Sequence, residues 1–170
     1  FDGVQTSNAV AEAEASVRVG RENLRFIESQ TLLDAVTVYM DVVRDQAIVR
    51  IRESNVGVLT RELEAAEIRR EAREVTKTDV AQARARRARA ISAADLARSD
   101  LKVARAQYER VVGHAPSRLV EPPLTNKLLP RSLSEALMIA ERESPNVASA
   151  LFREQAARHA VDKVWGELLP

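Results

Sequence analysis

A long stretch without proline, from Ser7 to Ala72, is the feature that most limits how this chain can fold. Only Gly20 and Gly57 interrupt it. A single helix over the whole stretch would span roughly 100 Å, at about 1.5 Å of rise per residue. Helices in ordinary globular domains are much shorter, so the stretch predicts a rod of the coiled-coil kind.

The apolar residues of this stretch follow a helical pattern. Near its two ends they recur at spacings of three, four or seven, at Val10, Ala13, Val17, Leu24, Ile27, Val56, Leu59, Leu63 and Ala66. Between Leu32 and Val43 the polar residues are Asp34, Thr37 and Asp41. These three form a narrow polar stripe on an otherwise apolar cylinder. The helix therefore needs neighbours on several sides at that level.

A turn is expected near residues 73–76, followed by a return helix from about Lys77 to Val112. Thr76 can cap this helix with Asp79 as its capping-box partner, and Gly113 can end it. The seven-residue repeat of the return helix, with Arg87 as the exception, places small side chains at the seam. Its members are Ala83, Ala90, Ala94, Ala97, Leu101, Ala104, Tyr108 and Val111.

The two predicted arms are unequal, because the return helix is roughly half as long as the first. Antiparallel pairing should therefore stop near the apolar region between Leu32 and Val43. The rest of the long helix needs another partner. That partner is the C-terminal helix, a segment missing from this chain, or another subunit.

The remainder of the chain divides into a linker and two shorter helices. Four prolines exclude helix from much of the linker, at Pro116, Pro122, Pro123 and Pro130. Ser132 or Ser134 can start a short helix, and a last helix is expected from about Asn146 to Leu168. We therefore predict an all-α fold in three parts. These are a long hairpin at 1–112 with its tip near 73–78, a linker with a short helix at 113–145, and a helix at 146–170.

Composition argues against catalysis. The chain has no cysteine and two histidines, and its formal net charge is +1. We find no Ser/His/Asp arrangement, glycine-rich phosphate loop or metal-ligand spacing, so we expect no enzyme activity, cofactor or metal. The chain begins at Phe1 without an initiator methionine, and we interpret it as a piece of a longer protein.

An arginine cluster near the tip, at residues 84, 86, 87 and 89, raises the possibility of nucleic-acid binding. Glu67, Glu71, Glu74 and Asp79 lie close by in the sequence, and no aromatic residue is interleaved for base stacking. A solvated or interhelical face is the better interpretation of the cluster. We therefore expect no nucleic-acid partner.

Several motifs together resemble the TolC family of outer-membrane efflux proteins. The string from Glu74 to Val80, followed by an alanine-rich helix, resembles the tip of that family's periplasmic hairpin. The stretch from Leu33 to Arg44 resembles the middle of its long helix. The stretches 130–137 and 143–147 resemble the start of its second structural repeat. Residues 1–3 and 168–170 resemble the ends of neighbouring barrel strands.

This resemblance implies a homotrimeric channel whose β-barrel crosses the outer membrane through segments absent from this chain. The helical part would form an α-barrel in the periplasm of a Gram-negative bacterium. Its tip would meet a periplasmic membrane-fusion adaptor, coupled to an inner-membrane pump. The expected function is a passive conduit in a tripartite efflux or type I secretion system, carrying drugs, toxic compounds or proteins.

The resemblance also implies which residues act at the tip. The expected residues for adaptor docking or gating are Arg73, Glu74, Val75, Thr76, Lys77, Thr78 and Asp79. By motif match, Asp79 takes the place of the family's tip aspartate, which helps to hold the aperture closed. Arg73 stands where the family usually has glycine, with Ala72 before it in place of valine. Whether this substitution alters docking is left open by the sequence.

Two other functions fit a long helical hairpin. One is a coiled-coil scaffold, and the other is the periplasmic adaptor protein of an efflux pump. Adaptor hairpins are usually flanked by β-rich lipoyl-like halves, and no such strand pattern flanks this one. The channel interpretation is therefore preferred.

Overall fold

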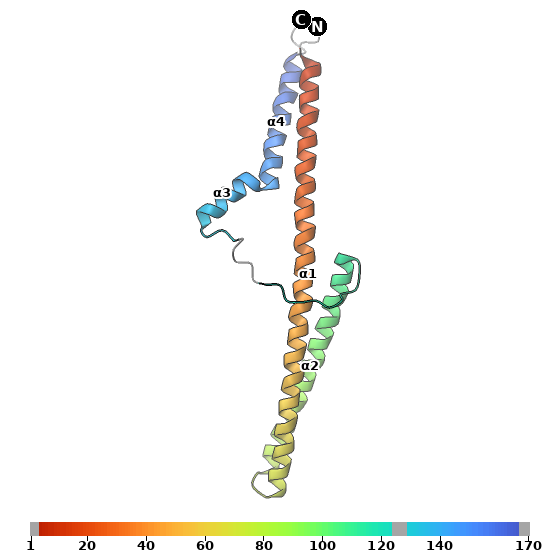
Figure 1. The fold of residues 1–170 in the computed structure, drawn as a ribbon, viewed down its shortest axis with the longest axis vertical. Helices are drawn as coiled ribbons and strands as arrows, with labels where there is room; N and C mark the ends of the chain where they lie inside the picture. The colour runs from red at the N-terminus through yellow and green to blue at the C-terminus, as the bar shows by residue number, and fades with distance from the viewer. Residues whose placement is uncertain (1–3, 124–128, 167–170) are drawn as a thin grey trace. The chain divides into compact units, whose positions relative to one another are not determined.

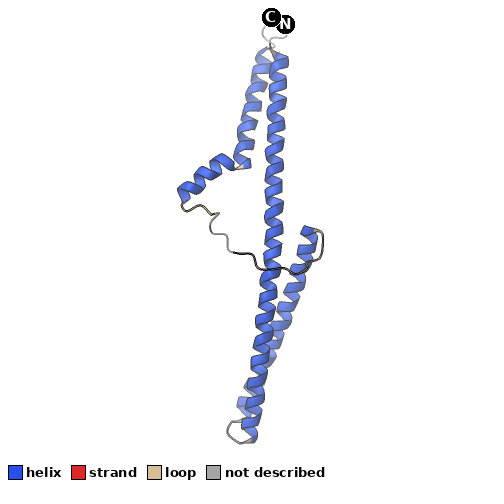
Figure 2. Ribbon diagram, viewed as in Figure 1, coloured by secondary structure: helices blue, strands red, loops and turns tan. Residues whose placement is uncertain are grey.

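The computed structural model describes residues 4–123 and 129–166, and over these ranges it contains four helices and no strand. The helices are α1 (Gln5–Glu71), α2 (Lys77–Val112), α3 (Leu133–Glu143) and α4 (Pro145–Gly166) (Figures 1 and 2). The prediction of an all-α fold is confirmed. The expected barrel-strand ends at 1–3 and 168–170 lie outside the described residues, as does the end predicted for the last helix.

The chain divides into two compact units, and α1 contributes to both. One unit consists of Phe1–Leu33 with Pro123–Pro170, and the other consists of Asp34–Pro122. The second unit contains the hairpin of α1 and α2, which run antiparallel (Figure 1).

Small side chains fill the seam between α1 and α2. The buried residues of α2 are Val80, Ala90, Ala94, Ala97, Ala104 and Tyr108. Four of these six are alanines, and alanine at a helix contact lets two backbones approach closely. The predicted seam is thus confirmed at Ala90, Ala94, Ala97, Ala104 and Tyr108, whereas Ala83, Leu101 and Val111 are only half-buried.

Polar side chains mark the register of the hairpin. Arg84 Nη2 lies 2.8 Å from Glu67 Oε1, and Arg98 Nη2 lies 2.8 Å from Glu53 Oε1. Between these two ion pairs, Arg87 Nε donates a hydrogen bond of 3.0 Å to Thr60 Oγ1. Exposed ion pairs contribute little to stability, so we assign them a role in fixing register.

The segment that follows α2 packs against α1 at the end of the hairpin away from the tip. Gly113, at φ 89°, caps α2 and donates its backbone N–H to Glu109 O at 2.9 Å. Leu119 then packs against a cluster built on Val42, which is completely buried. The Tyr39 hydroxyl donates to Val120 O at 2.6 Å and accepts from Val120 N at 3.0 Å. Tyr39 therefore joins the backbone of this segment to α1 through two hydrogen bonds.

In the first unit, α4 is the partner that the N-terminal part of α1 required. Lys163 Nζ lies 2.6 Å from Glu12 Oε2, and Ser149 Oγ donates to Asn23 Oδ1 at 3.0 Å. Ala15 of α1 is buried between these two contacts along the chain. Of the three partners left open by the sequence, the C-terminal helix is the one observed for this stretch.

The two C-terminal helices begin close to the positions that the sequence predicts. Ser132, not Ser134, caps α3 and accepts a hydrogen bond of 3.2 Å from Glu135 N. α4 begins at Pro145, one residue before the predicted start. Proline suits the first turn of a helix because it lacks an N–H and its φ is already helical.

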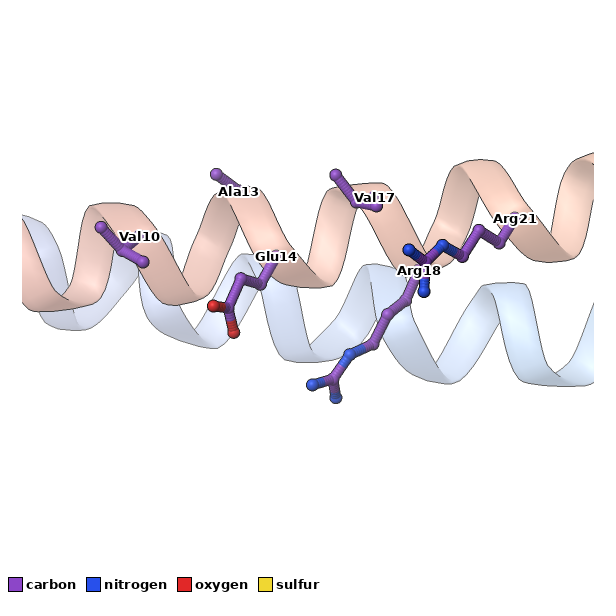
Figure 3. A pocket seen from close by; sticks show the side chains of 6 residues that line it. All are labelled: Val10, Ala13, Glu14, Val17, Arg18 and Arg21. Atoms are coloured by element: carbon purple, nitrogen blue, oxygen red, sulfur yellow. The ribbon is translucent and has the colours of Figure 1, made fainter.

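The apolar stripe of α1 is not the face that meets α4. Val10, Val17, Leu24 and Ile27 are each more than half exposed. In Figure 3, Ala13 and Val17 lie on the side of α1 that points away from α4. The apolar periodicity therefore does not identify the face of α1 that meets α4, and that face carries the small, buried side chain of Ala15. The stripe remains uncovered within one chain.

Replacing Tyr39 with phenylalanine tests the two hydrogen bonds between Tyr39 and Val120. The variant keeps the ring but loses both hydrogen bonds to Val120, so we expect the hairpin unit to lose about 1 kcal/mol of stability. Hydrogen exchange at the Val120 amide should quicken. The matched control is Tyr108→Phe, since the Tyr108 hydroxyl makes no hydrogen bond within the described residues. An unchanged rate of hydrogen exchange at the Val120 amide in Tyr39→Phe would contradict this role of Tyr39.

Candidate functional site

The tip begins where α1 ends in a Schellman arrangement. Arg73 N donates to Arg70 O and Glu74 N donates to Arg69 O, both at 2.9 Å. This pair of bonds satisfies carbonyls that the end of the helix would otherwise leave without partners. The motif requires a left-handed residue after the cap, and Arg73 takes that place with φ 61°.

Arg73 is an unusual residue for this conformation. A side chain in the left-handed region brings Cβ close to the following carbonyl, at a cost of roughly 1–2 kcal/mol, and glycine avoids this cost. The resemblance placed the family's tip glycine at this same position. The backbone geometry thus agrees with that alignment, while the residue type does not.

α2 begins with the capping box that the sequence predicts. Thr76 Oγ1 accepts a hydrogen bond of 3.2 Å from Asp79 N, and Thr76 N donates one of 2.8 Å to Asp79 Oδ2. The Thr76 hydroxyl also donates to Asp79 Oδ2 at 2.7 Å. The hydroxyl, and after it the backbone amide of Thr76, lowers the pKa of Asp79 below its ordinary value.

Val75 anchors the turn between the two helix ends. It packs with Ala83 against a buried cluster formed by Leu63, Ala66 and Val80. The cluster joins both arms of the hairpin directly behind the tip. We therefore assign Val75 a structural role, holding the turn in one conformation.

The other predicted tip residues are displayed to solvent. Arg73, Glu74, Thr76, Lys77, Thr78 and Asp79 are all exposed. Within the described residues, the side chains of Arg73, Glu74, Lys77 and Thr78 make no hydrogen bond or ion pair. The structure thus brings all seven predicted residues into one turn. Thr76, Asp79 and Val75 build it, and the charged side chains remain available to a partner.

Two further cations at the tip were missed by the sequence analysis. Arg69 and Arg70 occupy the last turn of α1 and are exposed. The sequence signal was present, because basic residues in the last turn of a helix are stabilised by its dipole. Together, Arg69, Arg70, Arg73 and Lys77 are named here the apex cations. None of them forms an ion pair with another described residue.

The arginine cluster behind the tip is partly used within the hairpin. Arg84 pairs with Glu67, and Arg87 is hydrogen-bonded to Thr60. These contacts agree with the interhelical role that was preferred over nucleic-acid binding.

Residues 4–123 and 129–166 contain neither a metal-ligating cluster nor a helix suited to cross a membrane. No group of three or more His, Cys, Asp or Glu side chains there is placed to hold a metal ion. None of the helices in those ranges combines the length and apolar character needed to cross a lipid bilayer.

Replacing Arg73 with glycine should stabilise the hairpin. Glycine removes the cost of the left-handed conformation, partly offset by its larger entropy when unfolded, so we expect a gain of about 1 kcal/mol. Urea unfolding followed by circular dichroism measures the change. As a control, Arg61→Gly in the interior of α1 should lose about 1 kcal/mol. A loss of stability in Arg73→Gly would show that the turn does not need a left-handed residue.

Removing the Asp79 charge should have an effect that depends on pH. Because folding lowers the pKa of Asp79, the ionised carboxylate stabilises the fold at neutral pH. This contribution disappears as the pH falls below about 4 and the carboxylate becomes protonated. Asp79→Asn should therefore melt below the wild type at pH 7, with the difference shrinking at acidic pH. A difference that is constant with pH would contradict the role of the charge.

The amino-acid sequence of the chain is similar to that of a known outer membrane protein. No protein-family model matches the chain, and no solved structure matches it. The outer membrane efflux protein BepC of Brucella suis biovar 1 (strain 1330) is 42% identical to it over 170 residues. The alignment covers 100% of this chain but 37% of BepC. The chain belongs to the TolC family of outer-membrane efflux proteins.

Proposed function

We propose that this chain forms part of the wall of a passive periplasmic conduit in an outer-membrane efflux channel. The observation that carries the proposal is the 42% identity to BepC, which extends over the whole chain. BepC is named an outer membrane efflux protein. The same role for this chain is an inference, because the chain spans 37% of that relative's length.

The hairpin of α1 and α2 suits a wall element. Its alanine seam gives a thin pair of helices, and its ion pairs fix the register along the pair. Hairpins of this kind can be set side by side around a pore. The proposed division is a hairpin at 1–112, an equatorial linker at 113–145 and a helix at 146–170 that leads toward the barrel.

Uncovered apolar side chains support assembly into a homotrimer. Leu24, Ile27, Leu32, Leu33 and Val36 are between 57% and 68% exposed in the single chain. Apolar surface of this extent on consecutive turns of one helix is typical of an interaction face. Neighbouring copies of the chain are the proposed cover. Closure of three copies would turn the hairpins into a tube.

The tip is the proposed contact with a periplasmic adaptor and, through it, with an inner-membrane pump. Asp79 is proposed to link neighbouring subunits and hold the aperture closed. Both Thr76 bonds reach Asp79 Oδ2, so Oδ1 is left to accept a further hydrogen bond. The conduit would carry drugs, toxic compounds or proteins unchanged, in a tripartite efflux or type I secretion system.

The proposal is tested in the bacterium that makes the protein. Deleting the gene should raise susceptibility to exported drugs, and restoring it should reverse the effect. Chemical crosslinking of the outer-membrane fraction should give a trimer. Changing Leu24 and Ile27 together to glutamate should abolish both the trimer and the rescue, because buried carboxylates would face one another.

The control is Arg105→Glu, which also introduces a carboxylate but at an exposed position of α2 that has no ion pair in the described residues. It should retain the trimer and the rescue. A protein that stays monomeric in the soluble fraction, with drug susceptibility unchanged by its deletion, would favour the coiled-coil scaffold and reject the conduit.

A further inference from the structure

We propose that Arg73 is a docking residue, and that the apex cations recognise a patch of carboxylates on a protein partner. The inference rests on the proposed function and gives its partner a surface chemistry. The proposed partner is a protein, the periplasmic adaptor, and its contacting surface would be acidic. A strained backbone, unpaired cations and a rigid support occur together in this turn.

The backbone of Arg73 is strained. Its φ of 61° belongs to the region that glycine enters freely and arginine enters at a cost. Its side chain is exposed and makes no hydrogen bond or ion pair within the described residues, so nothing inside the chain offsets that cost. Backbone strain clusters at functional sites. Here the strained residue exposes its guanidinium group to solvent.

Positive charge is concentrated around Arg73. Some arginines elsewhere in the hairpin are paired, as Arg84 is with Glu67 and Arg98 with Glu53, whereas others, such as Arg105, are not. The apex cations have no such partners among the described residues. The nearby carboxylate of Asp79 accepts hydrogen bonds from Thr76 and forms no ion pair with these cations among the described residues. Positive charge at the apex is therefore available to a carboxylate from outside the chain.

The mixed charges of the tip favour a protein over other anionic surfaces. Glu71 and Glu74 alternate with the apex cations along the turn and are exposed. A lipid or nucleic-acid surface, which is uniformly negative, would be repelled by these two carboxylates. A protein surface can set carboxylates against the cations and avoid the glutamates, and such patterned complementarity gives specificity.

The turn that carries the apex cations is held in one conformation. Val75 is packed in the cluster behind the tip, and the Schellman bonds and capping box fix both helix ends. A partner that binds the apex therefore loses little free energy in ordering this backbone. The cations are presented from a preformed turn.

The test measures binding of the purified adaptor from the same bacterium to the purified protein in detergent. The variants are Arg73→Gly, Arg73→Glu and Arg73→Lys, with Arg105→Glu as a control at an exposed, unpaired position of α2. We expect Arg73→Gly to weaken binding about fivefold and Arg73→Glu more, while Arg73→Lys retains most of it. Salt should reduce the difference between wild type and Arg73→Gly.

Melting temperatures are measured on the same samples. Because glycine relieves the turn, Arg73→Gly should be at least as stable as wild type while binding more weakly, which a purely structural role for Arg73 would not produce. Arg105→Glu should bind as wild type does.

Three outcomes would overturn the inference in distinguishable ways. Adaptor binding that is equal in wild type and all Arg73 variants rejects the docking role and leaves the proposed function standing. Failure of the wild type to bind any adaptor of that bacterium rejects the proposed function as well. Arg73-dependent binding to phosphatidylglycerol vesicles that exceeds binding to the adaptor rejects a protein partner.

Discussion

Close packing of α1 against α2 through alanine is the interaction on which the hairpin depends. Ala94 is 2% exposed, and Ala90, Ala97 and Ala104 are each below a tenth. Side chains this small hold the helices together by backbone proximity and dispersion, with few large apolar groups in the seam. Such a seam does little to specify register by shape, so the pairs of Arg84 with Glu67 and Arg98 with Glu53 acquire that role.

The unit formed by the N-terminal part of α1 and α4 is held differently. Its recorded contacts are largely polar, such as Lys163 with Glu12 and Ser149 with Asn23, around the small side chain of Ala15. This arrangement leaves the apolar stripe of α1 unused within the chain. In the proposed channel the stripe is the surface that neighbouring copies cover, and the tip is left free for the adaptor.

The sequence predicted best what is decided by local hydrogen bonding. Thr76, Asp79 and Gly113 were identified as caps because their side chains or backbone conformations act within one turn of the chain. The face of α1 that meets α4 could not be predicted from local hydrogen bonding. Periodicity reveals the Val10 stripe but not its partner, and Ala15 carries no signal until α4 is in place. The strain at Arg73 required backbone coordinates, although the resemblance had marked the position as one for glycine.

Distances between paired nitroxide labels would test the antiparallel register most directly. With cysteines introduced into a chain that has none, labels at Arg52 with Ser99 and at Ala65 with Arg86 occupy exposed, matched positions and leave both ion pairs intact. The account predicts short and similar distances for both label pairs. Labels at Ala65 with Ser99 should be clearly further apart, because about 20 Å of helix rise separates positions 52 and 65 along α1. Long or bimodal distances for the matched pairs would show a slipped or absent hairpin and contradict the account.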